Sequence, residues 1–171
     1  LTVPKARTLG VETVYQERAL ADLQTLWRNI FLGRELSNKL GMLKIGEMKR
    51  ETQRLMVESM EFTSSAVSTD PVIKTFSGGE KQGVAITRAL YFHAELAILD
   101  EPTIGLDPRQ VVEVRELIKE LGQRHTILLS THILGEVEQL CDRVIMIIDG
   151  HIYADMPTSG LMGPNTVIRL H

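Results

Sequence analysis

The chain lacks the features that mark several classes of protein. It contains one cysteine, Cys141, so no disulfide can form within it, which fits a reducing compartment. No run approaches the roughly 18 to 20 apolar residues of a membrane-spanning helix. The net charge is −3, which offers no basic surface to nucleic acid or anionic lipid. We therefore expect neither a disulfide scaffold, nor a membrane span, nor a nucleic-acid partner.

What remains is the composition of a globular protein. The 171 residues are 43% hydrophobic and 24% charged, which suits one domain with a proper core. Met48, Met56 and Met60, which fall in a helix predicted over about Glu47–Glu61, are expected to point inward and fill that core rather than to bind a ligand. Apart from His132, which is treated below, the histidines have no companion at metal-ligand spacing.

A turn of small residues, Ser77-Gly78-Gly79, opens a predicted helix that runs to Leu90, with Ser77 as its expected N-cap. Small side chains let backbone N–H groups approach a ligand closely, and the N–H groups and dipole of a helix start favour an anion. Apolar residues follow at roughly helical spacing: Val84, Ile86, Ala89 and Leu90. The turn is therefore a candidate anion site.

Four apolar residues, Leu96 to Leu99, come next and lead into two carboxylates, Asp100 and Glu101. A short apolar run before a turn predicts a buried strand of a parallel sheet. Ligands of open parallel sheets bind at the carboxyl ends of the strands, where these two acids would project. Adjacent acids at such a place suit a magnesium ion and a base that activates water.

The segment before this stretch is mainly helical. A short helix begun by Pro4 and closed by Gly10 precedes a strand from Val11 to Tyr15. The pattern from Glu17 to about Lys74 then predicts the following parts: a helix with Leu20, Leu23, Leu26 and Trp27 close to one face, a loop over 36–46, a helix from about Glu47 to Glu61, and a loop over 63–71.

The segment after the carboxylates alternates helices and strands. Asp107 as N-cap and Pro108 at the first position predict a helix to about Leu121. Further elements follow: a buried strand over Thr126–Ser130, a helix over about Leu134–Asp142 with Cys141 as a small core residue, a strand over Val144–Ile148, and a hairpin turn at Asp149-Gly150.

The Ser-Gly-Gly-Glu helix start followed by Leu-Asp-Glu-Pro-Thr resembles the signature and Walker B motifs of ATP-binding cassette (ABC) ATPases. Phe76 and Glu80 depart mildly from the leucine and glutamine most common in the signature. The resemblance covers essentially the whole chain and implies an α/β fold, a P-loop NTPase-like (RecA-like) parallel-sheet core with an inserted α-helical subdomain. Residues 1–16 and 89–171 would form the core sheet, and residues 17–88 the helical subdomain with the signature helix.

The resemblance also implies ATP and Mg²⁺ as cofactors and a role for each acidic or polar motif. Asp100 would hold the magnesium ion through water, and Glu101 would act as general base. Gln16, at the end of its strand, matches the Q-loop glutamine that reaches the magnesium and the attacking water. His132, after the strand over 126–130, resembles the switch histidine that contacts the γ-phosphate.

The remaining motifs would act between two subunits. In the family the signature turn, here Ser77, Gly78, Gly79 and Glu80, binds the γ-phosphate of the ATP that the opposite subunit holds. Asp107 falls in a segment that resembles the D-loop, which crosses the dimer interface. A helix N-cap followed by Pro108 explains Asp107 equally well, and both roles can hold.

One motif of the family is absent from the sequence. The phosphate-binding loop Gly-x-x-x-x-Gly-Lys-Ser/Thr does not occur, and the chain begins with Leu1. We expect a fragment without the N-terminal nucleotide-binding portion, the alternative being a degenerate cassette. Up to about Leu99 the amino-acid sequence resembles monosaccharide-importer ATPases, whereas from Asp100 onward it resembles exporter-type cassettes.

The expected function is thus the ATP-hydrolysing subunit of an ABC transporter, with monosaccharide import as the candidate transport. Its expected partners are a second cassette, transmembrane permease subunits and a solute-binding protein, which would place it at the cytoplasmic face of the membrane. The rival function is a non-catalytic module that lends its signature motif in trans. A soluble ABC ATPase of DNA repair or translation is disfavoured, because long coiled-coil heptads and a basic surface are absent.

Overall fold

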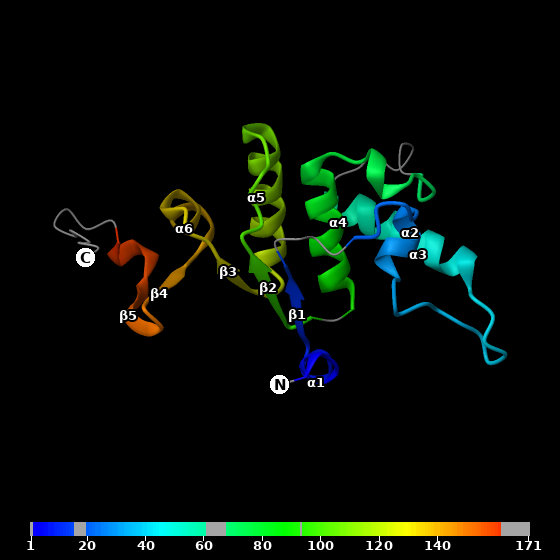
Figure 1. The fold of residues 1–171 in the computed structure, drawn as a ribbon, viewed down its shortest axis with the longest axis horizontal. Coiled ribbons are helices and arrows are strands. Elements are labelled where there is room, and N and C mark those ends of the chain that lie inside the picture. Colours follow the sequence, from blue (N-terminus) through cyan, green and yellow to red (C-terminus); the bar gives the residue numbers. More distant parts are fainter. Residues whose placement is uncertain (1, 16–19, 61–67, 93, 162–171) are drawn as a thin grey trace. The chain divides into compact units, whose positions relative to one another are not determined.

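The computed structural model describes residues 2–15, 20–60, 68–92 and 94–161, which belong to two compact units. The first unit comprises Leu1–Ser130 and the second Thr131–His171. Figure 1 shows the elements in chain order. No helix in the described part of the chain is long and apolar enough to cross a membrane.

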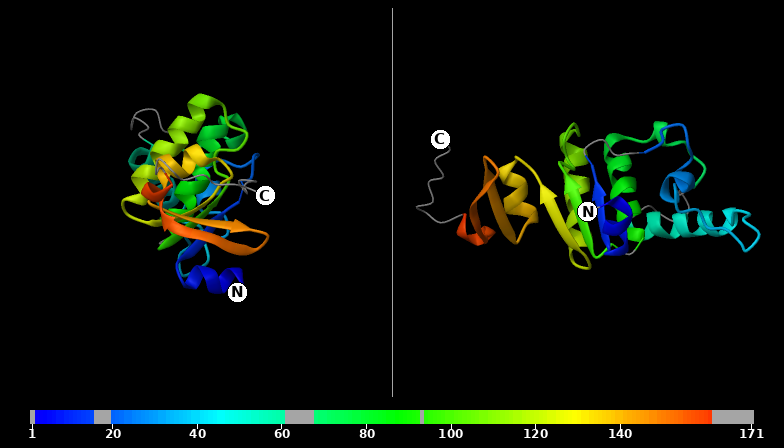
Figure 2. Two further views of the ribbon diagram at one scale, coloured as in Figure 1. Left: turned by 90° about the vertical axis from the view of Figure 1, so that its left-hand side faces the viewer. Right: turned by 60° about the horizontal axis from the view of Figure 1, so that its bottom comes forward.

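The first unit contains a three-stranded parallel sheet in the order β1-β2-β3. The strands are β1 (Val11–Val14), β2 (Leu96–Asp100) and β3 (Thr126–Ser130), and they lie side by side although they come from distant parts of the chain (Figure 2). The predicted parallel sheet is therefore confirmed. Ala97 and Leu99 of β2 are fully buried, as the apolar run before the carboxylates predicts.

The edge strand β3 is more exposed than predicted. Its residues alternate between exposed and half-buried, and Leu128 keeps 49% of its surface exposed. An apolar run alone does not distinguish a central strand from an edge strand, and β3 is covered by a neighbouring strand on one side of the described sheet only. The prediction of a buried strand is wrong for this reason.

Three helices of the first unit accompany the sheet: α1 (Val3–Thr8), α4 (Gly78–Tyr91) and α5 (Pro108–Gly122). Helices α4 and α5 pack against each other (Figure 1). The apolar positions predicted for α4 are all buried, and α5 buries a stripe at helical spacing: Val114, Leu117, Ile118 and Leu121.

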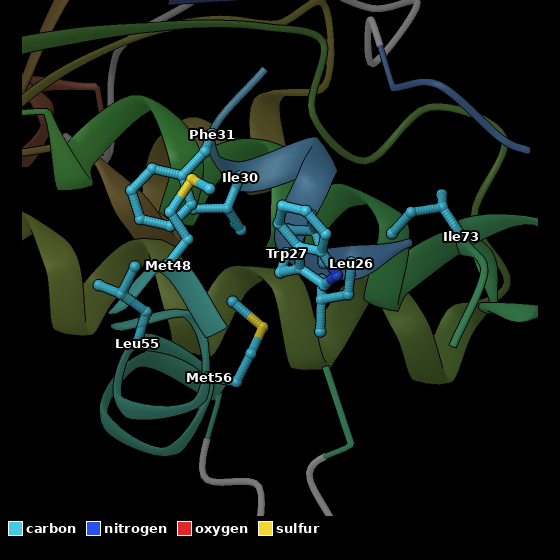
Figure 3. Packing of buried hydrophobic residues seen from close by; sticks show 9 residues of the cluster. Leu26, Trp27, Ile30, Phe31, Met48, Leu55, Met56 and Ile73 are labelled. Carbon is cyan, nitrogen blue, oxygen red and sulfur yellow. The ribbon is translucent and has the colours of Figure 1, made fainter. Parts of the chain in front are cut away.

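The other helices of this unit are α2 (Leu26–Ile30), α3 (Ile45–Met60) and the short η1 (Ile73–Thr75). Their apolar side chains gather into one cluster (Figure 3). Met48 and Met56 lie fully inside it beside Phe31 and Trp27. This agrees with the role of flexible core filler predicted for the methionines.

Among the described residues ahead of Leu26, 20–25 are not helical. They include a turn over residues 22–24, and Leu23, expected on the buried face, is 78% exposed. Instead, Leu26 and Trp27 donate backbone hydrogen bonds to the carbonyls of Pro71 and Thr69, at 3.0 and 3.2 Å. The segment therefore pairs with a distant stretch of chain, which local periodicity does not reveal.

The buried Asn29 holds this irregular segment. Its Oδ1 accepts a hydrogen bond from the Ala21 N–H at 2.7 Å. Its Nδ2 donates to the backbone carbonyls of Ala21, Gln24 and Thr25 at 3.1 to 3.3 Å. A carboxamide can serve both donors and acceptors in this way, so one side chain adds to the backbone hydrogen bonds that the same carbonyls accept.

The second unit contains α6 (Leu134–Leu140), the strands β4 (Arg143–Ile148) and β5 (His151–Pro157), and the short η2 (Thr158–Gly160). β4 and β5 pair antiparallel. Their turn has positive φ at Asp149 (48°) and Gly150 (76°), as a two-residue hairpin of type I′ requires. The predicted hairpin is confirmed.

Cys141 is half-buried just past the end of α6. Burial raises the pKa of its thiol above the ordinary value, and the nearby charges of Asp142 and Glu136 act in the same direction. The neutral thiol is thus favoured, as expected for a cysteine that packs rather than reacts. Only part of its surface is covered, so the core role predicted for it is met in part.

The first prediction concerns Asn29. Asn29→Ala leaves the Ala21 N–H without its acceptor and removes one of the donors to the Ala21, Gln24 and Thr25 carbonyls, which should lower the free energy of unfolding by about 1–3 kcal/mol. Urea denaturation of the chain followed by circular dichroism measures this loss. Lys39→Ala, in an exposed loop, is the control and should stay within about 0.5 kcal/mol of the parent. Equal stability of the two variants would contradict the role of Asn29.

Candidate functional site

The turn at the start of α4 is closed by a reciprocal pair of hydrogen bonds. The Ser77 Oγ accepts from the Glu80 N–H at 3.2 Å, and the Glu80 carboxylate accepts from the Ser77 N–H at 2.7 Å. The predicted N-cap at Ser77 is thus confirmed as half of a capping box. The second half, Glu80, was readable from the Ser-x-x-Glu spacing but was interpreted only as a ligand-binding residue.

A further hydrogen bond joins the turn to the neighbouring helix α5. The Gly79 N–H donates to Oε1 of Gln110 on α5 at 3.1 Å. A Cβ at position 79 would lie 3.1 Å from the Cβ of Gln110, so a larger residue here would push Gln110 back by a few tenths of an ångström. The Ser77 hydroxyl hydrogen and the Gly78 N–H are donors that none of these caps uses, and they suit an anion at the helix start.

Asp107 caps α5 as predicted. Its Oδ1 accepts from the N–H groups of Arg109 and Gln110, both at 3.0 Å, and Pro108 occupies the first turn. The structural explanation of Asp107 is therefore confirmed, whereas a role across a dimer interface stays a prediction.

Asp100 and Glu101 lie where the sequence places them, at the carboxyl end of β2. Asp100 stands in register with Ser130 on β3, and the Ser130 hydroxyl donates to Oδ1 of Asp100. The Glu101 N–H donates to the Ser130 carbonyl at 3.0 Å. Glu101 itself has a φ of 42°, a left-handed conformation that costs a non-glycine residue about 1–2 kcal/mol. Such strain is often found at functional sites.

These groups fit a magnesium ion whose remaining ligands are phosphate oxygens and waters. The Asp100 carboxylate and the Ser130 hydroxyl are hard oxygen donors, and Mg²⁺ in nucleotide sites takes one or two carboxylates together with phosphates and waters. Within the described residues, no group of three or more His, Cys, Asp or Glu side chains could hold a metal alone. Ser130 was not among the predicted site residues, because a serine at a strand end carries no signal by itself.

His132 lies in the second unit, directly after Thr131. The Thr131 hydroxyl donates to the carboxylate of the fully buried Glu136 at 2.7 Å and accepts from the Ile133 N–H at 3.1 Å. These bonds fix the backbone on both sides of His132. Glu136 is not among the predicted site residues, since nothing in the sequence indicates that it pairs with the Thr131 hydroxyl. Gln16 lies outside the described residues, so the meeting of Gln16, His132 and Glu101 stays a prediction.

Comparison with known proteins places these motifs in context. The family model described as ABC transporter matches residues 3–104. The xylose/arabinose import ATP-binding protein of Sulfolobus acidocaldarius is 34% identical over 148 residues, which cover 86% of this chain and 57% of that protein. The bacitracin transport ATP-binding protein of Bacillus licheniformis is 42% identical over 110 residues, which cover 63% of this chain and 36% of that protein.

A solved structure has the same fold. It is an ATP-binding cassette in a dimeric post-hydrolysis state bound to ADP and Pi, and it matches with a TM-score of 0.69 at 22% identity over 92% of this chain and 68% of that one. The match supports the predicted parallel-sheet α/β architecture. The chain spans only about half, or less, of the length of the two relatives above.

The capping box generates the second prediction. Ser77→Ala removes the acceptor for the Glu80 N–H and should lower the free energy of unfolding by about 1 kcal/mol. Glu80→Gln keeps an acceptor for the Ser77 N–H and should stay within about 0.5 kcal/mol. Urea denaturation of the parent and both variants tests this, and a Glu80→Gln loss as large as that of Ser77→Ala would show that the charge, not the hydrogen bond, matters.

Proposed function

Because the chain belongs to the ABC transporter family of ATP-binding cassettes, we propose that it serves as the ATP-hydrolysing part of a transporter that drives a solute across a membrane. The observation that carries this proposal is the pair Asp100 and Glu101 at the carboxyl end of a central parallel strand, held in place by Ser130. An acid pair at such a sheet end is where a nucleotide and its metal ion are expected.

In this proposal each residue has a separate task. Asp100, with Ser130 beside it, holds Mg²⁺, which neutralises phosphate charge when bound. Glu101 accepts a proton from the attacking water as general base. Gln16 and His132 orient that water and the terminal phosphate of ATP. Positioning and charge stabilisation of this kind account for most of the catalysis in phosphoryl transfer.

The signature turn acts on ATP that a second cassette holds. Ser77, Gly78, Gly79 and Glu80 supply a rigid helix start for its phosphates, and Asp107 lies in the segment that follows the catalytic acids. The capping box and the Gln110 tie support this role, since they present the turn in one fixed shape. The dimeric state of the solved cassette with ADP and Pi agrees with such an arrangement.

We further propose the partners and the location. Transmembrane permease subunits and a solute-binding protein complete the transporter, and the cassette sits at the cytoplasmic face of the membrane through the permeases. Monosaccharide import is supported by the pentose importer among the relatives. The bacitracin transport protein among them shows that family membership alone does not select the solute.

The second candidate is a signature donor without its own catalysis. It is favoured by one observation: the sequence contains no phosphate-binding loop motif, whereas its signature turn is completely formed. Such a chain would contribute Ser77 and the α4 start to ATP bound by a partner.

Two assays test the action of the signature turn on a partner's ATP, which both candidates require, and the general-base variant below tests the catalysis that only the first candidate has. ATP hydrolysis is measured for the 171-residue chain alone and for its mixture with an intact ABC cassette. We expect no activity alone and stimulation in the mixture, which Ser77→Ala should abolish and the exposed Lys39→Ala should leave unchanged. Robust hydrolysis by the chain alone would mean that its phosphate site lies elsewhere in this sequence.

The general base generates a further prediction. In an intact-length cassette that carries this sequence, Glu101→Gln should lower the rate of ATP hydrolysis on the order of 10² to 10⁴-fold while ATP binding persists. Single-turnover hydrolysis of radiolabelled ATP measures the rate, and equilibrium binding of ATP serves as the control. Normal hydrolysis by this variant would rule Glu101 out as the base.

A further inference from the structure

We propose that Gln110 is a positioning residue that couples the segment after the catalytic acids to the signature turn. The proposal rests on the function proposed above and extends it to a residue outside the predicted motifs. When the start of α5 shifts, Gln110 shifts Gly79 with it. The Ser77 hydroxyl and the Gly78 N–H, which would face phosphate, then move as well.

Gln110 is bonded in two directions. Its backbone N–H donates to Oδ1 of Asp107, a residue of the D-loop-like segment, at 3.0 Å. Its side-chain Oε1 accepts from the N–H of Gly79, 31 residues earlier in the chain, at 3.1 Å. One residue therefore links the cap of α5 to the first turn of α4.

Packing makes this link stiff. A Cβ at position 79 would lie 3.1 Å from Cβ and 3.2 Å from Cγ of Gln110. Gly79 is buried and Gln110 is half-buried, so water competes little for the Gly79 N–H. A hydrogen bond shielded from water in this way is stronger than an exposed one, and through it Gly79 follows a shift of the α5 start.

The other contacts of the turn do not replace this link. The capping box of Ser77 and Glu80 is local: it sets the shape of the turn but not its place relative to α5. The ion pair between Lys81 and Asp22, at 3.0 Å, ties the same helix end to the irregular segment before α2 and not to α5. The acceptor of Gln110 therefore serves a purpose that neither of them serves.

The test compares two side chains of similar size. Gln110→Glu keeps an acceptor oxygen for the Gly79 N–H, whereas Gln110→Met keeps the bulk and loses the oxygen. Gln123→Ala, an exposed glutamine at the other end of α5, is the control. Hydrogen exchange of the Gly79 amide is followed by NMR in the 171-residue chain, and thermal unfolding checks that each variant folds.

We expect the Gly79 amide to exchange about fivefold faster in Gln110→Met, since a net hydrogen bond of roughly 1 kcal/mol is lost. Gln110→Glu and Gln123→Ala should exchange at the parent rate. If Gln110→Met does not fold, Gln110→Ala takes its place in the comparison. Unchanged Gly79 exchange in the variant without the acceptor, or equal acceleration in Gln110→Glu, would overturn the proposal.

Function is read separately, as stimulation of an intact cassette by the chain. Gln110→Met should reduce the stimulation and Gln110→Glu should restore it, a rescue that loss of packing alone would not give. If the parent chain fails to stimulate, the proposed function fails while the exchange result still decides the role of Gln110 in positioning. If the parent chain stimulates and both variants match it, the coupling role is wrong although the function stands.

Discussion

The pairing of β2 with a parallel strand on each side is the constraint on which the candidate site depends. Hydrogen bonds to β1 and β3 let the strand bury Ala97 and Leu99 completely, because buried backbone groups must find partners. The register of β2 with β3 places Ser130 beside Asp100 and supplies the carbonyl that the Glu101 N–H bonds. Without this pairing Asp100 and Glu101 would lie in a loop, and their carboxylates would have no fixed orientation.

A cluster of charges ties the helical part of the first unit to this sheet. Glu12 of β1 pairs with Arg7 and with Arg34, which follows α2. The guanidinium of Arg34 also lies 4.4 Å from the ring centre of Phe92, a cation–π contact. Burial lowers the pKa of Arg88 below its ordinary value, and the charge of Glu12 opposes that shift. The negative charge of Glu12 thus offsets part of the cost of placing several guanidinium groups close together where water is partly excluded.

The sequence predicts those features that local chemistry determines. Ser77 before a helix, Asp107 followed by Pro108, and four apolar residues before Asp100 each carry their own physical reason, and the structure has all three. The features that escape prediction join residues far apart in the chain. Gln110 bonds a residue 31 positions away and Ser130 one 30 positions away, and the bridge between Thr25 and Val72 replaces an expected helix. Such contacts leave no periodic trace in the sequence.

The outer strands of the three-stranded sheet have a consequence for the behaviour of the chain in solution. β1 and β3 each have one border without a neighbouring strand in the described sheet, and Leu128 adds an exposed apolar side chain on β3. A free strand border is a template for further strands, including those of identical molecules. Such borders favour pairing between molecules at high concentration, and a peptide with strand propensity that pairs with one border would compete with that self-association.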